Sequence, residues 1–372
     1  MKRKRVLFTG YAPVHFLCFR PVYEQLASDE RVEVWLSGGF RVEIDKKKKL
    51  YEYRVEGFYD RLGVDQGRVV PIERAREMDF DVLVCSHLSD ALFPRSVRKT
   101  VQIFHGVSFK NLAVRDKALR FDLLCLPGRY HAEQYRERGL MRPGGSRFLL
   151  TGFPKSDAIV AQGFDRTALL REHGLDPALP LVLLAPTGDK DNALDTMGES
   201  LVAAIRDSGR FNLLVKPHDH PKRAVNWQER LRPLENERFR VVGSWDVVPY
   251  LKAADVLVTD ASSVAVEYTL LDRPIVFVDV PTLFARVEER SEAMDLATYG
   301  RKIGTIVQRP EDAAAAIADA LAHPAREAPL RRKMAEHVFH RPGTVAGRVA
   351  NVVRHAAGIE PALPADVEVL EA

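Results

Sequence analysis

The sequence predicts an α/β protein made of two doubly wound, Rossmann-like domains, each with its own parallel sheet. Short apolar runs rich in Val, Leu and Ile alternate along the 372 residues with segments of helical periodicity. The runs are continuously apolar, as is typical of parallel strands that helices cover on both faces. Six such runs occur in each half of the chain, and two doubly wound domains would supply that number.

The expected strands of the first half lie at 5–10, 32–38, 81–87, 100–106, 122–128 and 147–152. Those of the second half lie at 181–187, 212–218, 239–244, 256–262, 274–280 and 304–308. A short helical pattern and a Pro-rich turn between 155 and 180 separate the halves, so we expect domains at 1–158 and 159–340. We also expect a helix at 341–358 that packs back on the first domain, and a mobile tail at 359–372, which is rich in Pro and acidic residues.

The composition is that of a globular protein and excludes several classes. The 55 basic and 51 acidic residues give a net charge of +4, which does not indicate a nucleic-acid partner. Three scattered cysteines indicate a reducing compartment rather than a disulfide framework or a zinc cluster. The sequence shows neither a signal peptide nor a run of roughly 18 apolar residues that could span a membrane. We therefore expect a cytoplasmic protein that at most attaches to the inner face of the cell membrane.

Small or polar groups stand at the carboxyl ends of many expected strands. In open α/β sheets, ligands bind outside these ends. We expect the two domains to face each other across a cleft lined by these groups. They are Thr9, Gly10, His87, His105, Gly106, Gly152, Thr187, His218 and Asp260.

The segment 259–267, TDASSVAVE, would leave a strand and start a helix, and its serines have two interpretations. Ser262 or Ser263 could cap the helix, which stabilises it by about 1 kcal/mol. A helix start also holds phosphate through its unpaired N–H groups and its partial positive charge. Glu267 would lie on the same helix face as Ser263 and suits a ribose diol. The group as a whole suits a nucleoside diphosphate.

Residues 259–278 resemble the nucleotide-binding motif of the CDP-glycerol glycerophosphotransferases of teichoic-acid synthesis, T-D-Y-S-S-x-x-x-D followed by a Pro-Ile strand. Ala261 and Glu267 depart from this motif, which has Tyr and Asp there. Further stretches agree with the family in order and spacing. They are VQIFHGVSFK (101–110), TGFPKSDAI (151–159), LLAPTGDKD (183–191), LLVKPHDHP (213–221) and HRPGTVAGRVANVV (340–353).

The resemblance implies a GT-B fold and transfer of glycerol phosphate from CDP-glycerol to a hydroxyl of a lipid-linked glycan acceptor, with release of CMP. It implies His105 as general base, Lys216 and His218 as the groups that neutralise the diphosphate, and Glu267 as the ribose contact. We expect no cofactor. The other residues that the resemblance places at the substrate are Gly106, Gly152, Lys155, Thr187, Thr259, Asp260, Ser262 and Ser263.

The chemistry of this transfer favours a histidine independently of the family. An acceptor hydroxyl must lose its proton as it attacks phosphorus, and a neutral imidazole accepts a proton near neutral pH. His105 could instead bond the backbone at its strand end, and His220 is as good a candidate as His218. His15, after the first strand, could contact the acceptor or be an ordinary loop histidine.

Two charged stretches each have two possible interpretations. Asp189 and Asp191 have the D-x-D spacing that some sugar transferases use for a divalent ion, but a single D-x-D is frequent and we expect no metal. The run Lys46–Lys49 is a solvated face or a contact with anionic lipid headgroups.

Two other functions remain open. A nucleotide-sugar glycosyltransferase, or an enzyme like UDP-N-acetylglucosamine 2-epimerase, would use the same fold and could place a glutamate at position 267. A non-catalytic binder is the third class. The serines at 262 and 263 and the His105-Gly106 pair favour the phosphotransferase.

Overall fold

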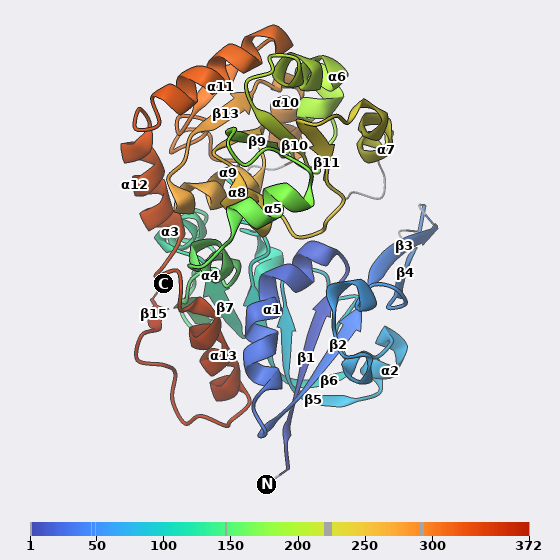
Figure 1. Ribbon diagram of the computed structural model, residues 1–372. Helices are drawn as coiled ribbons and strands as arrows, with labels where there is room; N and C mark the ends of the chain where they lie inside the picture. Colours follow the sequence, from blue (N-terminus) through green and yellow to red (C-terminus); the bar gives the residue numbers. More distant parts are fainter. Residues whose placement is uncertain are drawn as a thin grey trace. The chain divides into compact units, whose positions relative to one another are not determined.

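The computed structural model describes residues 2–45, 47–48, 50–145, 147–218, 225–290 and 294–371, and the chain forms two compact units (Figure 1). The first unit contains Met1–Gly106, Ala113–Ala158 and His337–Ala372. The second unit contains Val107–Leu112 and Ile159–Glu336. Besides the short excursion at Val107–Leu112, the chain passes from one unit to the other within α4 (Lys155–Val160) and again within α12 (Ala328–Val338).

The first unit contains a seven-stranded sheet in the order β15-β8-β7-β6-β5-β1-β2. Its strands are β1 (Lys4–Gly10), β2 (Val32–Gly38), β5 (Asp79–Cys85), β6 (Ser96–Ile103), β7 (Leu123–Leu126), β8 (Arg147–Leu150) and β15 (Glu368–Leu370). Neighbouring strands are parallel except for β15 and β8, which pair antiparallel. A separate antiparallel pair, β3 (Phe40–Asp45) and β4 (Leu50–Arg54), follows β2.

Helices cover both faces of this sheet, which explains its continuously apolar strands. They are α1 (Pro13–Ala27), α2 (Ile72–Arg76), α3 (Arg129–Glu137) and α13 (Val345–Ala356). In β1, Phe8 packs on Phe19 of α1 with ring centroids 5.0 Å apart. The preceding Leu7 instead joins a core cluster with Tyr135 of α3. Because successive strand residues point to opposite faces, α1 and α3 lie on opposite sides of the sheet, and α13 lies beside α1.

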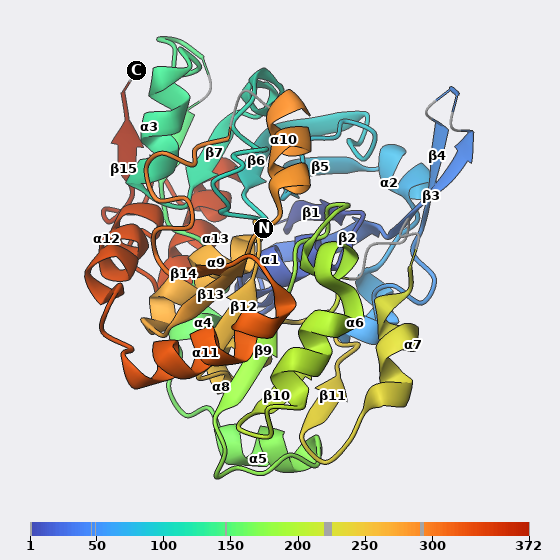
Figure 2. The ribbon, with the colours of Figure 1, turned by 90° about the horizontal axis from the view of Figure 1, so that it is seen from above.

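The second unit contains a six-stranded, fully parallel sheet in the order β11-β10-β9-β12-β13-β14. Its strands are β9 (Leu181–Leu184), β10 (Asn212–Val215), β11 (Phe239–Val241), β12 (Val256–Thr259), β13 (Ile275–Val278) and β14 (Thr305–Val307). Its helices are α5 (Arg166–Glu172), α6 (Ala193–Arg206), α7 (Trp227–Leu231), α8 (Val248–Ala253), α9 (Ser263–Tyr268), α10 (Pro281–Arg290) and α11 (Ala313–Ala322). Figure 2 shows α6 beside α11, and the two helices are in contact, as are α5 and α8.

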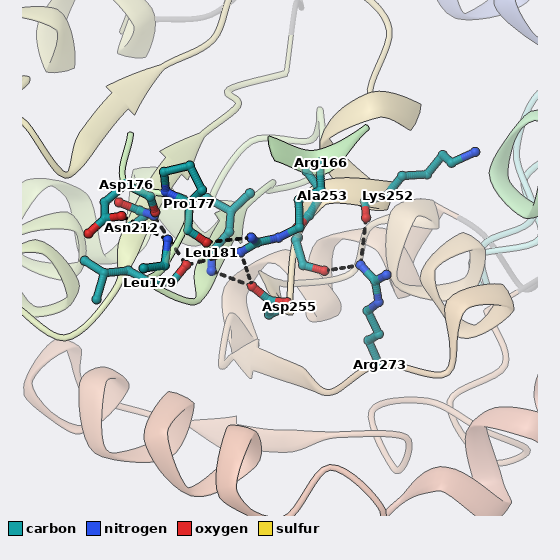
Figure 3. Close-up of polar contacts among 12 residues, drawn as sticks. Arg166, Asp176, Pro177, Leu179, Leu181, Asn212, Lys252, Ala253, Asp255 and Arg273 are labelled. Carbon is teal, nitrogen blue, oxygen red and sulfur yellow. Dashed lines mark hydrogen bonds and ion pairs between the residues drawn. The ribbon is translucent and has the colours of Figure 1, made fainter. Parts of the chain in front are cut away.

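Polar contacts hold together the amino-terminal edge of the second sheet (Figure 3). Arg166 of α5 donates to Oδ2 of Asp255 at 2.7 Å. The same oxygen accepts the backbone N–H of Leu181, the first residue of β9, at 2.7 Å. Arg273 donates to the carbonyl oxygen of Lys252 at 2.7 Å. These contacts fix the starts of β9 and β12.

The predicted α/β class with two parallel sheets is confirmed, and every predicted strand is present. Strands β3, β4 and β15 were not predicted. The tail predicted to be mobile contains β15, because Leu370 pairs with Phe148 and is buried in the core of the first unit. Residues 107–112, predicted in the first domain, belong to the second unit. Among the described residues, the helices fall short of the length and apolarity that crossing a membrane requires.

A joint between 151–157 and α13 secures the C-terminal helix on the first unit. Gly152 has φ +103°, and a Cβ there would lie 2.5 Å from the carbonyl oxygen of His340, so the site requires glycine. The carboxylate of Asp157 accepts the N–H groups of Gly343 at 2.6 Å and Ala346 at 2.8 Å, at the start of α13. Buried Arg348 of α13 donates in turn to the carbonyl oxygen of Thr151. The joint thus connects the motif stretch at 151–159 with the motif stretch at 340–353, which are far apart in the sequence.

Replacing Asp157 with Ala should lower the free energy of unfolding by about 1–2 kcal/mol, since it removes the acceptor that caps α13. Urea denaturation measures this loss. Asp157→Asn is the matched control, because it keeps one acceptor oxygen and should lose less. Equal stability of Asp157→Ala and the unmodified chain would contradict the capping role.

Candidate active site

Three histidines of the first unit gather at the carboxyl ends of three adjacent parallel strands. His15 lies in the first turn of α1, after β1, whereas His87 and His105 follow the ends of β5 and β6. The ring centroid of His15 lies 4.7 Å from that of His105 and 5.5 Å from that of His87. We call these three residues the histidine cluster. Neighbouring strands bring together residues that are far apart in the sequence.

The tautomer of His105 follows from its backbone contact. Its Nδ1 faces the carbonyl oxygen of Ser86, and a carbonyl only accepts, so Nδ1 carries the proton and donates it. The neutral ring therefore has its lone pair on Nε2. Burial lowers the pKa of His105, so the ring is uncharged at neutral pH. A neutral imidazole with a lone pair on a defined nitrogen is the state that a general base requires.

The other two rings of the cluster are also neutral. Burial, followed by the nearby His105, lowers the pKa of His15 well below its ordinary value. The Nδ1 of His15 accepts the backbone N–H of Tyr11 at 3.1 Å, so its proton is on Nε2. Burial lowers the pKa of His87 to about 3, and its Nε2 lies 3.1 Å from Oγ1 of Thr9. The same Thr9 oxygen lies 3.1 Å from the thiol sulfur of Cys85, which closes the base of the cluster.

Aromatic and cationic groups border the cluster. The ring of Tyr11 lies edge-on to His15, with centroids 4.5 Å apart, and 5.0 Å from that of His87. The guanidinium of Arg41, on β3, stacks over Tyr11 at 4.6 Å. The positive charge of Arg41 also contributes to lowering the pKa of His15 and of His87.

In the second unit, a lysine network occupies the end of β9. The Nζ of buried Lys110 donates to Oγ1 of Thr187 at 2.9 Å and to Oδ2 of Asp189 at 2.6 Å. Gly188, between these two residues, lies against His218, since a Cβ on Gly188 would fall 2.9 Å from the His218 ring. The structure thus brings the loop that follows β9 against His218, which the sequence placed at the end of a separate strand.

Asp260 and Thr259, at the end of β12, support neighbouring loops. The two oxygens of Asp260 accept the backbone N–H groups of Thr187 and Ala193, both at 2.8 Å. Burial raises the pKa of the Asp260 carboxyl. Thr259 donates its hydroxyl to the carbonyl oxygen of Ala185 at 2.6 Å. These contacts tie the loop after β12 to the loop after β9, and they favour a positioning role for both side chains.

The residues of the serine motif differ in burial. Ser262 is the N-cap of α9, and its Oγ lies 3.5 Å from the N–H of Val264, in agreement with the capping interpretation. Ser263 is half-buried, and Glu267 is buried at 1% exposure. Lys216 is buried just beyond the end of β10. The role of these side chains at a diphosphate stays a prediction.

Both carboxylates of the D-x-D pair already have cationic partners. Asp189 binds Lys110, and Asp191 binds Arg286 of α10. Within the described ranges, the structure contains no group of three His, Cys, Asp or Glu side chains arranged to hold a metal ion. The arrangement therefore favours internal ion pairs for these two aspartates.

The remaining predicted residues lie in different places. Gly106 follows His105, whereas Gly152 and buried Lys155 belong to the joint that holds α13. His220 lies outside the described residues, as do Lys46 and Lys49. His105 and His15 are in the first unit, and the other predicted donor-site residues from Thr187 to Glu267 are in the second. The prediction that these groups meet across a cleft stays a prediction.

Sequence reasoning placed His87 among the strand-end groups expected to line the cleft, but it missed Tyr11 and Arg41 beside the histidine cluster, and Lys110 and Arg286 in the second unit. For Lys110 a signal existed, because it ends the VQIFHGVSFK stretch that includes His105. For Arg286 the signal was absent, since its partner Asp191 lies far away in the sequence.

Replacing Asp260 with Ala should lower the free energy of unfolding of the second unit by about 2–6 kcal/mol, because it leaves two buried N–H groups without a partner and each costs about 1–3 kcal/mol. Asp260→Asn keeps one acceptor oxygen and should lose about half as much. Urea unfolding followed by tryptophan fluorescence provides the measurement. An exposed aspartate, Asp207, serves as control, and its replacement should change little. A loss no larger than that of Asp207→Ala would contradict the positioning role.

The comparisons with known proteins agree with one another. A family model described as CDP-Glycerol:Poly(glycerophosphate) glycerophosphotransferase matches residues 78–355. A teichoic acid poly(glycerol phosphate) polymerase of Staphylococcus epidermidis is 27% identical over 48% of this chain and 28% of its own length. A teichoic acid glycerol-phosphate primase of Bacillus spizizenii is 26% identical over 42% of this chain and 40% of its own length. The matched region thus covers less than half of the length of either curated relative.

A solved structure of the wall teichoic acid polymerase TagF has the same fold. It matches this chain with a TM-score of 0.68 at 16% identity, and the match covers 95% of this chain and 89% of that one. This likeness confirms the GT-B fold that the resemblance implied.

Proposed function

This chain belongs to the CDP-glycerol:poly(glycerophosphate) glycerophosphotransferase family, and we propose that it transfers glycerol phosphate from CDP-glycerol to a hydroxyl of a lipid-linked glycan acceptor. The observation that carries the proposal is the state of His105, a neutral imidazole at a strand end whose Nε2 holds the lone pair. We place the reaction in the cytoplasm, at the inner face of the membrane, where an enzyme can reach a lipid-linked acceptor.

In the proposed reaction, the acceptor oxygen attacks the phosphorus atom next to glycerol. His105 Nε2 takes the proton of the acceptor hydroxyl as the new P–O bond forms, which contributes about 10²–10⁴-fold to the rate. The bond between this phosphorus and the bridging oxygen breaks, and CMP leaves with that oxygen. Protonation leaves His105 as an imidazolium whose Nδ1–H still donates to the Ser86 carbonyl oxygen, so the ring keeps its orientation.

The second unit would hold the donor. CMP gains negative charge as it leaves, so cations and hydrogen-bond donors must surround the diphosphate. Lys216 supplies buried charge just beyond the end of β10, Lys110 donates to Thr187 and pairs with Asp189, and His218 lies against Gly188. Ser262 and Ser263 would add hydroxyl and backbone donors at the start of α9. We assign the ribose to Glu267 by its position in the motif, and we propose that the reaction uses no metal or cofactor.

A panel of CDP- and UDP-linked donors tests this proposal. Purified protein with CDP-glycerol and a glycan acceptor should release CMP in proportion to acceptor modified. Chromatography of the nucleotides identifies the product. Release of UDP from a nucleotide sugar, or epimerisation of UDP-N-acetylglucosamine without an acceptor, would instead establish the alternative function on the same fold.

Replacing His105 with Ala should lower turnover by about 10²–10⁴-fold while CDP binding is kept, because the base acts on the acceptor. Calorimetry measures the CDP affinity. His355→Ala, in the same unit but on α13, is the control and should keep turnover. The rate of the unmodified enzyme should stay level as pH falls through 6.5, the ordinary histidine pKa, and decline only at lower pH, since burial lowers the pKa of His105. Undiminished turnover in His105→Ala would refute the assignment of the base.

A further inference from the structure

The β3–β4 hairpin, residues 40–54, has an unusual tip. Ile44 and Leu50 are each 53% exposed, the largest exposed fractions among the large apolar side chains that the structure describes. Single exposed apolar residues are common on protein surfaces, but these two lie on either side of one turn. The turn between them contains four consecutive lysines, of which Lys47 and Lys48 are described and exposed. Apolar and cationic groups therefore share one tip.

The base of the hairpin is firmly held to the first unit. Gly38 and Gly39 have φ of +103° and +96°, and a Cβ on Gly38 would fall 2.0 Å from the carbonyl oxygen of Gly10. Gly39 donates its N–H to that oxygen at 2.8 Å. Further along, the ring of Tyr51 stacks with Arg41 at 4.9 Å, and Tyr53 is buried. The hairpin stands apart from the seven-stranded sheet (Figures 1 and 2), so a fixed base carries an exposed tip.

The turn itself is ordered by an aspartate. Oδ1 of Asp45 accepts the N–H groups of Lys47 at 2.9 Å and of Lys48 at 3.0 Å. The carboxylate of Asp45 therefore binds within the turn, and the side chains of Lys47 and Lys48 are exposed. The net charge of the segment from Ile44 to Leu50 is +3, from four lysines and one aspartate.

The hairpin begins at the same sheet edge as the histidine cluster. Arg41 of β3 stacks on Tyr11, and Tyr11 contacts both His15 and His87. The hairpin and the proposed base thus belong to the same unit and are linked through the contacts of Arg41 and Tyr11. Whatever surface the tip contacts is oriented relative to His105.

We propose that the β3–β4 hairpin is a membrane-surface anchor, with Ile44 and Leu50 entering the headgroup boundary of an anionic bilayer and the lysines binding lipid phosphates. A short apolar pair with flanking cations suits this interface, where burial of apolar area and attraction to anionic lipid act together. The proposal rests on the proposed function in one respect, since a lipid-linked acceptor is presented at that surface. Anchoring by the hairpin would direct the acceptor hydroxyl toward the edge that carries His105.

Co-sedimentation of the full chain with vesicles tests the anchor. The probes are phosphatidylcholine vesicles with and without one-third phosphatidylglycerol, in the absence of any donor. Ile44→Ser/Leu50→Ser should weaken partition onto the anionic vesicles at least tenfold. Replacing Lys46–Lys49 with Ser should weaken it about fivefold per lysine in low salt and remove its salt dependence.

The matched control is Ile306→Ser/Leu330→Ser, which removes two similarly exposed apolar side chains outside the hairpin, at 44% and 40% exposure. It should leave partition unchanged, and all variants should keep CDP binding. Equal partition of the unmodified chain and Ile44→Ser/Leu50→Ser, or equal binding to neutral and anionic vesicles, would overturn the anchor. Because the vesicle assay contains no donor or acceptor, a failed transferase assay would refute the proposed function and leave this result standing.

Discussion

Helices cover both faces of each main sheet, so apolar side chains fill the space along the strands, and the polar groups gather where the strands end. In the first unit, this constraint places His15, His87 and His105 at one edge, because β1, β5 and β6 are parallel neighbours. In the second unit, it places the ends of β9, β10 and β12 side by side. The opposite edge of the second sheet is occupied by the contacts of Arg166 and Asp255 (Figure 3). The order of the parallel strands thus determines at which edge of each sheet a site can form.

Burial determines which ionisable side chains are neutral and which charged ones need a partner. It keeps the histidine cluster neutral, and the contact of His105 with Ser86 leaves the lone pair on one defined nitrogen. The carboxylates behave differently, because a buried acid needs donors. Buried Asp260 accepts two backbone N–H groups, and partly buried Asp189 pairs with the buried Lys110. Residues that a sequence motif groups together therefore divide into those that can meet a substrate and those that hold the loops in place.

Much of the fold was predictable, because a fully buried parallel strand leaves a continuous apolar run in the sequence. The strands β3 and β4 left no such run, since one side of the hairpin faces solvent, and β15 has three residues. The polar ends of strands were predictable as candidate site residues for the same topological reason. The partners of these residues were not predictable. Asp157 contacts α13, and Asp191 contacts Arg286, because the fold brings together segments that no spacing in the chain relates.

The burial of the cysteines has a practical consequence. Cys18, Cys85 and Cys125 are all buried, and burial raises the pKa of the Cys85 and Cys125 thiols to about 12. Thiolates at these two positions are therefore scarce at neutral pH, and alkylating reagents react with the thiolate. A single cysteine introduced on the surface would be modified selectively in the otherwise native chain. Fluorophores or spin labels could then be attached in each unit, and the distance between the units followed in solution without first removing the natural thiols.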